Sequence, residues 1–236
     1  MNIVESKGKQ FVIKRVVDGR DGRMLRYNSS MCFGCEMCST VCPQNAITLY
    51  PIAYMFVRGS KIRIDSNKCI LCGICSEVCP SNALKVDGVK INLRKFFLAN
   101  FECEDCKICE EVCPWDAILS VDGKKEWVKE LCIFCGRCAK YCPDDKIFVE
   151  KPISGEVNIG DDCKLCGVCM DICPSNAISF DGKKMVVDTD ICIFCGACRN
   201  ACPIKVIEVK RYDIKIENSD YPWFFRHREA INTLKR

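Results

Sequence analysis

The cysteines of this chain repeat in one fixed spacing, which restricts its fold more than any other feature of the sequence. All 24 cysteines among the 236 residues fall into complete copies of the motif C-x2-C-x2-C-x3-C-P, and none is left over. One copy could arise by accident, whereas six complete copies could not. In chain order the motifs contain Cys32, Cys35, Cys38 and Cys42; Cys69, Cys72, Cys75 and Cys79; Cys103, Cys106, Cys109 and Cys113; Cys132, Cys135, Cys138 and Cys142; Cys163, Cys166, Cys169 and Cys173; Cys192, Cys195, Cys198 and Cys202.

Cysteine at this density indicates either a disulfide scaffold or a metal protein. The first residues, MNIVESKGKQ, are polar and charged and have no apolar core of the secretory kind. Without export, closely spaced cysteines are more often metal ligands than disulfide partners. No segment approaches the roughly 20 apolar residues that cross a bilayer. We therefore expect a cytoplasmic metal protein without a membrane span.

The spacing favours iron–sulfur clusters over zinc. Structural zinc sites combine C-x2–4-C pairs, or cysteine with histidine, in sets of four. Here triplets precede a lone fourth cysteine, and the only histidine, His227, lies far from every motif and is expected on the surface of the tail. The motif resembles the bacterial-type ferredoxin run, in which a tight loop holds three corners of a cubic cluster. Six [4Fe–4S] clusters are the implied cofactors.

A second repeat follows each C-P pair. Two residues later, a small residue usually precedes an aliphatic one, as in Ala46-Ile47, whereas Lys146-Ile147 and Val206-Ile207 depart from this pattern. We expect each aliphatic residue to begin a short strand that covers a cluster. The pairs Asp122-Gly123 and Asp181-Gly182 predict hairpin turns between such strands.

The distances between motifs indicate how they pair. The chain resembles two-cluster bacterial ferredoxins, whose motifs are joined by a short hairpin. The next motif begins 19 positions after Cys113 and 19 positions after Cys173, so motif three fits with four and motif five with six. Motifs one and two then form a pair with a longer connection. A shifted arrangement, with two beside three and four beside five, stays open because Asp87-Gly88 and the run before Cys32 also read as hairpins.

The expected fold is α+β, with three tandem two-cluster ferredoxin-like modules stabilised by their cofactors. A module of about 60 residues buries little core of its own, so cluster binding should supply folding free energy. The predicted domains are an N-terminal extension, 1–29; three ferredoxin-like domains, 30–98 with an apolar insert at 50–60, 99–152 and 153–211; and a C-terminal docking tail, 212–236.

The ferredoxin resemblance also implies how the ligands are shared. In such a pair, the first three cysteines of a motif bind one cluster and the fourth binds the other. Each pair of motifs would then exchange its fourth cysteines: Cys42 with Cys79, Cys113 with Cys142, and Cys173 with Cys202.

The net charge changes once clusters are counted. The 35 Lys and Arg against 31 Asp and Glu give +4. Each cluster with four thiolates adds about −2, so six would bring the total to about −8. The basic residues are dispersed along the chain and form no patch of the kind that binds nucleic acid. They are better explained as compensation for anionic clusters.

No catalytic constellation is visible, and a ligand set made only of cysteine leaves no iron open for a substrate. Phe134, Phe194 and Trp115 are interpreted as shields of the sulfurs from water. The acidic pairs Asp144-Asp145 and Asp161-Asp162 are interpreted as turn and capping residues. We therefore expect a non-catalytic electron-transfer subunit.

The chain resembles the polyferredoxins of methanogenic archaea, above all the F subunit of formylmethanofuran dehydrogenase, although usual F subunits carry more motifs. The residues that carry this resemblance are Lys14-Arg15-Val16-Val17, Arg26-Tyr27, Leu49-Tyr50-Pro51-Ile52, Arg58-Gly59 and Glu150–Val157.

The resemblance implies that the chain conducts electrons from ferredoxin, hydrogenase or heterodisulfide reductase towards the subunit that reduces CO2, with formylmethanofuran as the product. The alternatives are a polyferredoxin of a hydrogenase or heterodisulfide reductase system, and an independent soluble carrier. The apolar insert and the aromatic tail favour a subunit of a complex.

Overall fold

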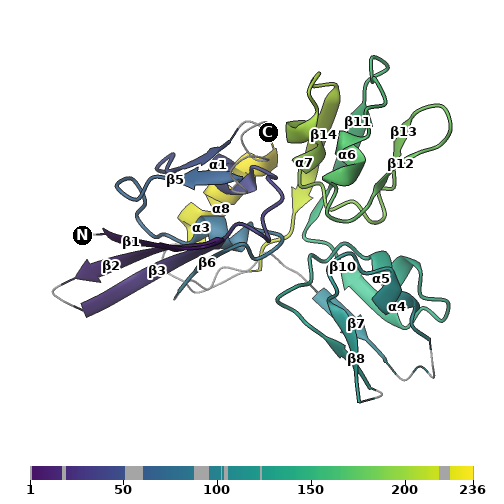
Figure 1. Ribbon diagram of the computed structural model, residues 1–236, viewed down its shortest axis with the longest axis horizontal. Helices are drawn as coiled ribbons and strands as arrows, with labels where there is room; N and C mark the ends of the chain where they lie inside the picture. The colour runs from purple at the N-terminus through teal and green to yellow at the C-terminus, as the bar shows by residue number, and fades with distance from the viewer. Residues whose placement is uncertain are drawn as a thin grey trace. The chain divides into compact units, whose positions relative to one another are not determined.

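The computed structural model describes residues 2–17, 20–50, 61–87, 96–101, 103, 106–122, 124–217 and 224–235. The chain forms two compact units, one made of residues 1–93 with 216–236 and the other of residues 94–215 (Figure 1). The first unit contains motifs one and two, and the second contains motifs three to six. None of the helices in the described part is long and apolar enough to cross a membrane.

One antiparallel strand layout occurs three times, and we call each copy a module. A strand before the odd-numbered motif pairs with a strand after the even-numbered motif. These outer pairs are β3 (Arg20–Asn28) with β6 (Leu84–Val86), β7 (Phe96–Ala99) with β10 (Ile147–Glu150), and β11 (Ile153–Ile159) with β14 (Ile207–Ile214).

Within each module, the strand after the odd motif pairs with the strand before the even motif. These inner hairpins are β4 (Ile47–Leu49) with β5 (Ile62–Ile64), β8 (Ile118–Val121) with β9 (Lys124–Trp127), and β12 (Ile178–Phe180) with β13 (Met185–Val187). Together the two sets of pairs join motif one with two, three with four and five with six. This layout supports the sequential pairing over the shifted one, and the domain boundaries stay a prediction.

The second sequence repeat marks the starts of strands, as expected. The aliphatic residue after each C-P pair begins a strand in all six copies: Ile47, Leu84, Ile118, Ile147, Ile178 and Ile207. The turn at Asp181 is held by its own carboxylate, which accepts hydrogen bonds from the backbone N–H groups of Lys183 and Lys184 at 2.9 and 2.8 Å. Asp122 lies between β8 and β9, while Gly88, Gly123 and the insert at 51–60 lie outside the described residues.

Each motif carries a short helix that includes its third cysteine. The helix ends two residues before the fourth cysteine in the first five motifs and one residue before it in the sixth. The following C-P pair stops the helix, because proline lacks the N–H that the next turn would need. These helices are α1 (Met37–Thr40), α3 (Ile74–Glu77), α4 (Ile108–Glu111), α5 (Arg137–Lys140), α6 (Val168–Asp171) and α7 (Ala197–Ala201).

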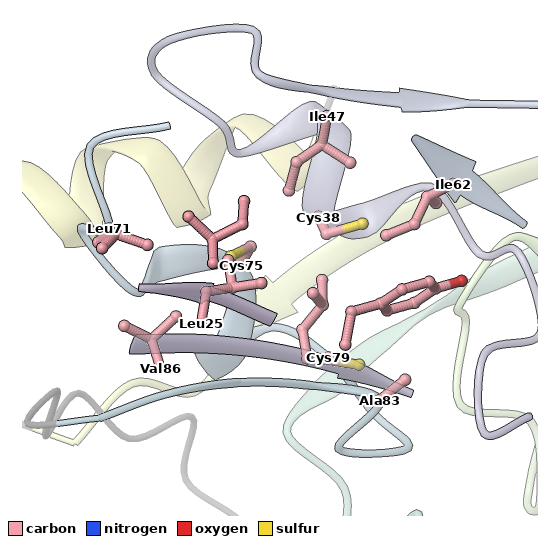
Figure 2. Close-up of a cluster of buried hydrophobic side chains, with 12 residues drawn as sticks. Leu25, Cys38, Ile47, Ile62, Leu71, Cys75, Cys79, Ala83 and Val86 are labelled. Carbon is pink, nitrogen blue, oxygen red and sulfur yellow. The ribbon is translucent and has the colours of Figure 1, made fainter. Parts of the chain in front are cut away.

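The first unit has two additional strands at its N-terminal end. β1 (Asn2–Lys7) and β2 (Gln10–Val17) extend the outer pair into a sheet with the order β1-β2-β3-β6. Ile13 and Leu25, on β2 and β3, are buried beneath the motifs. Cys38, Cys75 and Cys79 lie among the aliphatic side chains of this core (Figure 2).

The C-terminal segment returns to the first unit. α8 (Phe224–Asn232) contacts α3, and the following 3-10 turn η1 (Thr233–Lys235) contacts α1. His227, Ile231 and Leu234 are buried. The prediction that His227 is a surface residue is therefore wrong, because this side of the helix is covered by the chain's own first unit.

Candidate metal centres

The predicted ligand sets can be followed in the structure as six sites. Each site takes the number of the motif that would supply its first three cysteines. Four sites are cavities, each lined by three cysteines of one motif and the fourth cysteine of its partner motif. These sets are Cys32, Cys35, Cys38 and Cys79 for site one; Cys69, Cys72, Cys75 and Cys42 for site two; Cys132, Cys135, Cys138 and Cys113 for site four; and Cys192, Cys195, Cys198 and Cys173 for site six.

For the remaining two sites, the contacts of the described residues bring together only some of the expected ligands. At site three, Cys109 interacts electrostatically with Cys106 and shares an apolar cluster with Cys142. At site five, Cys169 interacts with Cys163 and Cys166, and the side chain of Cys166 is exposed. The places of Cys103 at site three and Cys202 at site five stay predictions.

Left-handed backbone lets each motif curl around its site. The residue two positions after the first cysteine has a positive φ in every motif where it is described: Gly34, Leu71, Phe134, Leu165 and Phe194. The residue after the second cysteine has φ of 70° to 90° in five motifs: Glu36, Gly73, Gly136, Gly167 and Gly196. Lys107 in motif three departs from this, with φ −109°. Glycine adopts such φ values without steric cost, so the glycine after the second cysteine is the sequence signal for this turn.

A further left-handed residue lies three positions after every fourth cysteine. Its φ is between 46° and 56° in Asn45, Asn82, Asp116, Asp145, Asn176 and Lys205. Asn and Asp tolerate this conformation better than most residues. The turn directs the next backbone N–H at the fourth sulfur, and Ala46, Ala117, Lys146 and Ala177 donate to the Sγ atoms of Cys42, Cys113, Cys142 and Cys173, each at 3.3 Å.

Other groups also contact the sulfurs. The backbone N–H groups of Phe134 and Phe194 donate to the Sγ atoms of Cys132 and Cys192, at 3.4 Å in both cases. The buried hydroxyl of Ser175 lies 3.7 Å from the Sγ of Cys173. Hydrogen bonds of this kind stabilise negative charge on sulfur and tune bound clusters.

The buried cysteines of these sites have raised thiol pKa values. Burial, together with the charge of neighbouring thiols, raises the pKa of Cys135 to about 11 and of Cys198 to about 12. Burial likewise raises the pKa values of Cys38 and Cys75 well above the usual thiol value. Thiolates gathered so closely need cations to offset their charge, and iron ions would supply that charge and displace the protons.

Basic side chains lie near several sites. Lys61 interacts electrostatically with Cys32 of site one and Arg23 with Cys72 of site two. Lys125, paired with Glu110, does the same with Cys109 of site three. These positions agree with the interpretation of the basic residues as compensation for anionic clusters.

The aromatic residues interpreted as shields, Trp115, Phe134 and Phe194, line the cavities of sites four and six. Phe134 and Phe194 are also buried. Trp127 stacks on Phe97 with ring centroids 4.3 Å apart and meets Phe134 edge-on at 5.9 Å. Phe97 and Trp127, which the sequence reading did not single out, also line the cavity of site four.

Strand layout and cysteine-lined cavities together define a ferredoxin-type protein with tandem two-cluster modules. Two family models, both described as 4Fe-4S dicluster domains, match the sequence. The first matches residues 31–83, 68–117 and 162–206, more than half of the chain, and the second matches residues 102–147. The chain belongs to the 4Fe-4S dicluster domain family and is an iron–sulfur electron-transfer protein with several such domains. The matches overlap at motif two, whose strands pair with those of motif one.

A solved structure resembles nearly the whole chain. It is a chain of the formate dehydrogenase–heterodisulfide reductase–formylmethanofuran dehydrogenase complex from Methanospirillum hungatei, 28% identical, with a TM-score of 0.80. The similarity covers 98% of this chain and 91% of that chain. The resemblance to the formylmethanofuran dehydrogenase system is thus confirmed. No curated protein matches the sequence.

Proposed function

We propose that the chain binds six [4Fe–4S] clusters and conducts electrons within a multi-subunit complex that reduces CO2 to formylmethanofuran. The four cavities lined by crossed sets of cysteines carry the cluster part of this proposal. When bound, each cluster would supply one-electron redox chemistry. The chain's own residues would hold it, exclude water and set its potential.

The ligands proposed are the 24 cysteines, with the fourth cysteines exchanged within each module. The backbone N–H groups that donate to sulfur would favour the more negatively charged reduced state. The buried phenylalanines and aliphatic side chains around the sulfurs would favour the less charged oxidised state, because burial penalises charge. The balance between these effects sets each potential.

The placement in a CO2-reducing complex is supported by the similarity to a chain of the Methanospirillum hungatei complex. Ferredoxin, hydrogenase or heterodisulfide reductase would be the electron donors, and the substrate chemistry would belong to other subunits. This chain would then be non-catalytic and cytoplasmic. A polyferredoxin of a hydrogenase or heterodisulfide reductase system is the second candidate, because the same complex contains heterodisulfide reductase.

Anaerobic copurification with the tagged chain tests this placement. We expect subunits that form formylmethanofuran to copurify, and the dithionite-reduced chain to support CO2 reduction by those subunits. Copurification with hydrogenase or heterodisulfide reductase alone would favour the second candidate. Elution as a single chain without partners would contradict the subunit role.

A further inference from the structure

The boundary between the second and third modules, both within residues 94–215, is held by specific polar contacts. The Nε1–H of Trp115 donates to the carbonyl of Pro174 at 2.8 Å, and Nη1 of Arg137 donates to the carbonyl of Asn176 at 3.3 Å. Nζ of Lys140 pairs with the carboxylate of Asp188 at 2.6 Å. These contacts join motifs three and four to motifs five and six.

The contacts connect two particular sites. Trp115 and Arg137 line the cavity of site four, and Pro174 lines the cavity of site six. A single hydrogen bond therefore links the wall of one cavity to the wall of the other. Site five, which follows site four in sequence, has no side chain in these contacts among the described residues, and its Cys166 is exposed.

Lys151 places a positive charge at the same boundary. It leaves the second module just after β10, and its Nζ donates to the carbonyls of Thr189, Asp190 and Cys192 at 2.8, 3.0 and 3.1 Å. The ammonium also lies 5.3 Å from the centre of the Phe194 ring.

The electrostatic reach of Lys151 extends to both sites. Its ammonium interacts with Cys192 of site six and with Cys135 of site four. These two cysteines belong to different modules, so the charge of Lys151 acts on ligands on both sides of the boundary.

We propose that sites four and six are the adjacent pair across this boundary, so that electrons cross residues 94–215 in the order three, four, six, five, with Lys151 as the positioning cation between the modules. This rests on the proposed function. Within each module the exchange of fourth cysteines keeps sites three and four adjacent, and likewise five and six. At each step one electron leaves a reduced site and enters an oxidised one, and no bond or proton moves.

The physical role of Lys151 follows from its position. A positive charge near two sites stabilises the extra electron on either of them. It therefore raises both potentials together, so that neither site becomes a trap relative to the other. Removing the charge should lower both.

Potentiometric titration of the complete, cluster-loaded chain, monitored by electron paramagnetic resonance, tests the proposal. In Lys151→Met we expect two midpoint potentials to shift to more negative values while the others stay unchanged. Lys151→Arg should retain the original potentials. Lys210→Met is the matched control, because this exposed lysine of the third module pairs with the carboxylates of Glu156 and Glu208, and it should shift none.

Two backgrounds assign the shifted signals. With site six disabled by Cys195→Ala, Lys151→Met should shift one potential. With site five disabled by Cys166→Ala, it should still shift two. Iron content, expected to fall by about four ions in either background, verifies that only one cluster is lost.

Three results would contradict the proposed adjacency of sites four and six. No shift in Lys151→Met, a shift of one potential in the complete chain, or two shifts persisting without site six would overturn the order four to six while leaving the proposed function intact. Absence of [4Fe–4S] signals from the loaded wild-type chain would overturn the proposed function and this inference together.

Discussion

Substituting Ile231 in the C-terminal helix should loosen the covering of the first unit. Its side chain is fully buried, with 0% exposed. Truncating a buried isoleucine to alanine costs about 2–5 kcal/mol. A helix of nine residues is too short to be stable by itself, so the docked state of α8 depends on this packing. We expect Ile231→Ala to lower the free energy of undocking α8 by that amount.

Hydrogen exchange measured by mass spectrometry on the cluster-loaded chain gives the readout. Because each 1.4 kcal/mol is tenfold, exchange through undocking should accelerate by roughly 30-fold to 4,000-fold. The affected amides should be those of α8 and of the helices it and η1 contact, including Val41 in the first unit, which donates to Met37, and Val78, which donates to Ile74.

The same helix supplies a matched control. Phe225 is 70% exposed, so Phe225→Ala should change the free energy by less than about 0.5 kcal/mol. Unchanged exchange in Ile231→Ala would refute the reasoning. Equal acceleration in α6 and α7 would also refute it, because these helices belong to the other unit.

Three further outcomes follow from the structure. Gly155→Ala should destabilise the pairing of β11 with β14 by about 1–3 kcal/mol, because the new Cβ would collide with the carbonyl of Lys210, whereas Gly160→Ala, whose Cβ would lie 3.4 Å from the nearest atom, should change the melting temperature little. Thiols must lose their protons to bind iron, and in the unfolded metal-free chain they are no longer buried; the ferrous-ion affinity of that chain should therefore rise from pH 7 to pH 9, and a flat profile by competition with a chelator would contradict this. Chelating the iron should unfold the modules, and a cooperative thermal transition in the metal-free chain would show otherwise.

The parts of the structure that the sequence predicted are governed by local chemistry. Proline after the fourth cysteine ends each helix, and Ile47 and its counterparts begin strands because the preceding turn is built into the repeat. The left-handed turn at Asn45 could have been predicted in the same way, because Asn and Asp favour that conformation.

The parts that the sequence did not predict depend on contacts between distant segments. The burial of His227 arises because α8 docks on the first unit, and no local pattern encodes which surface a short helix will cover. Likewise, Lys151 binds backbone carbonyls, which every residue possesses, so its partners could not be identified from side-chain types.

If all 24 cysteines are ligands of six clusters, the loaded chain must contain iron and sulfide in matching amounts. Anaerobic determination of iron and acid-labile sulfide measures both. We expect about 24 of each per chain, with the electron paramagnetic resonance spectrum of [4Fe–4S] clusters after reduction. A content of zinc in place of iron and sulfide, or a saturating value near half of that prediction, would contradict the assignment of six clusters.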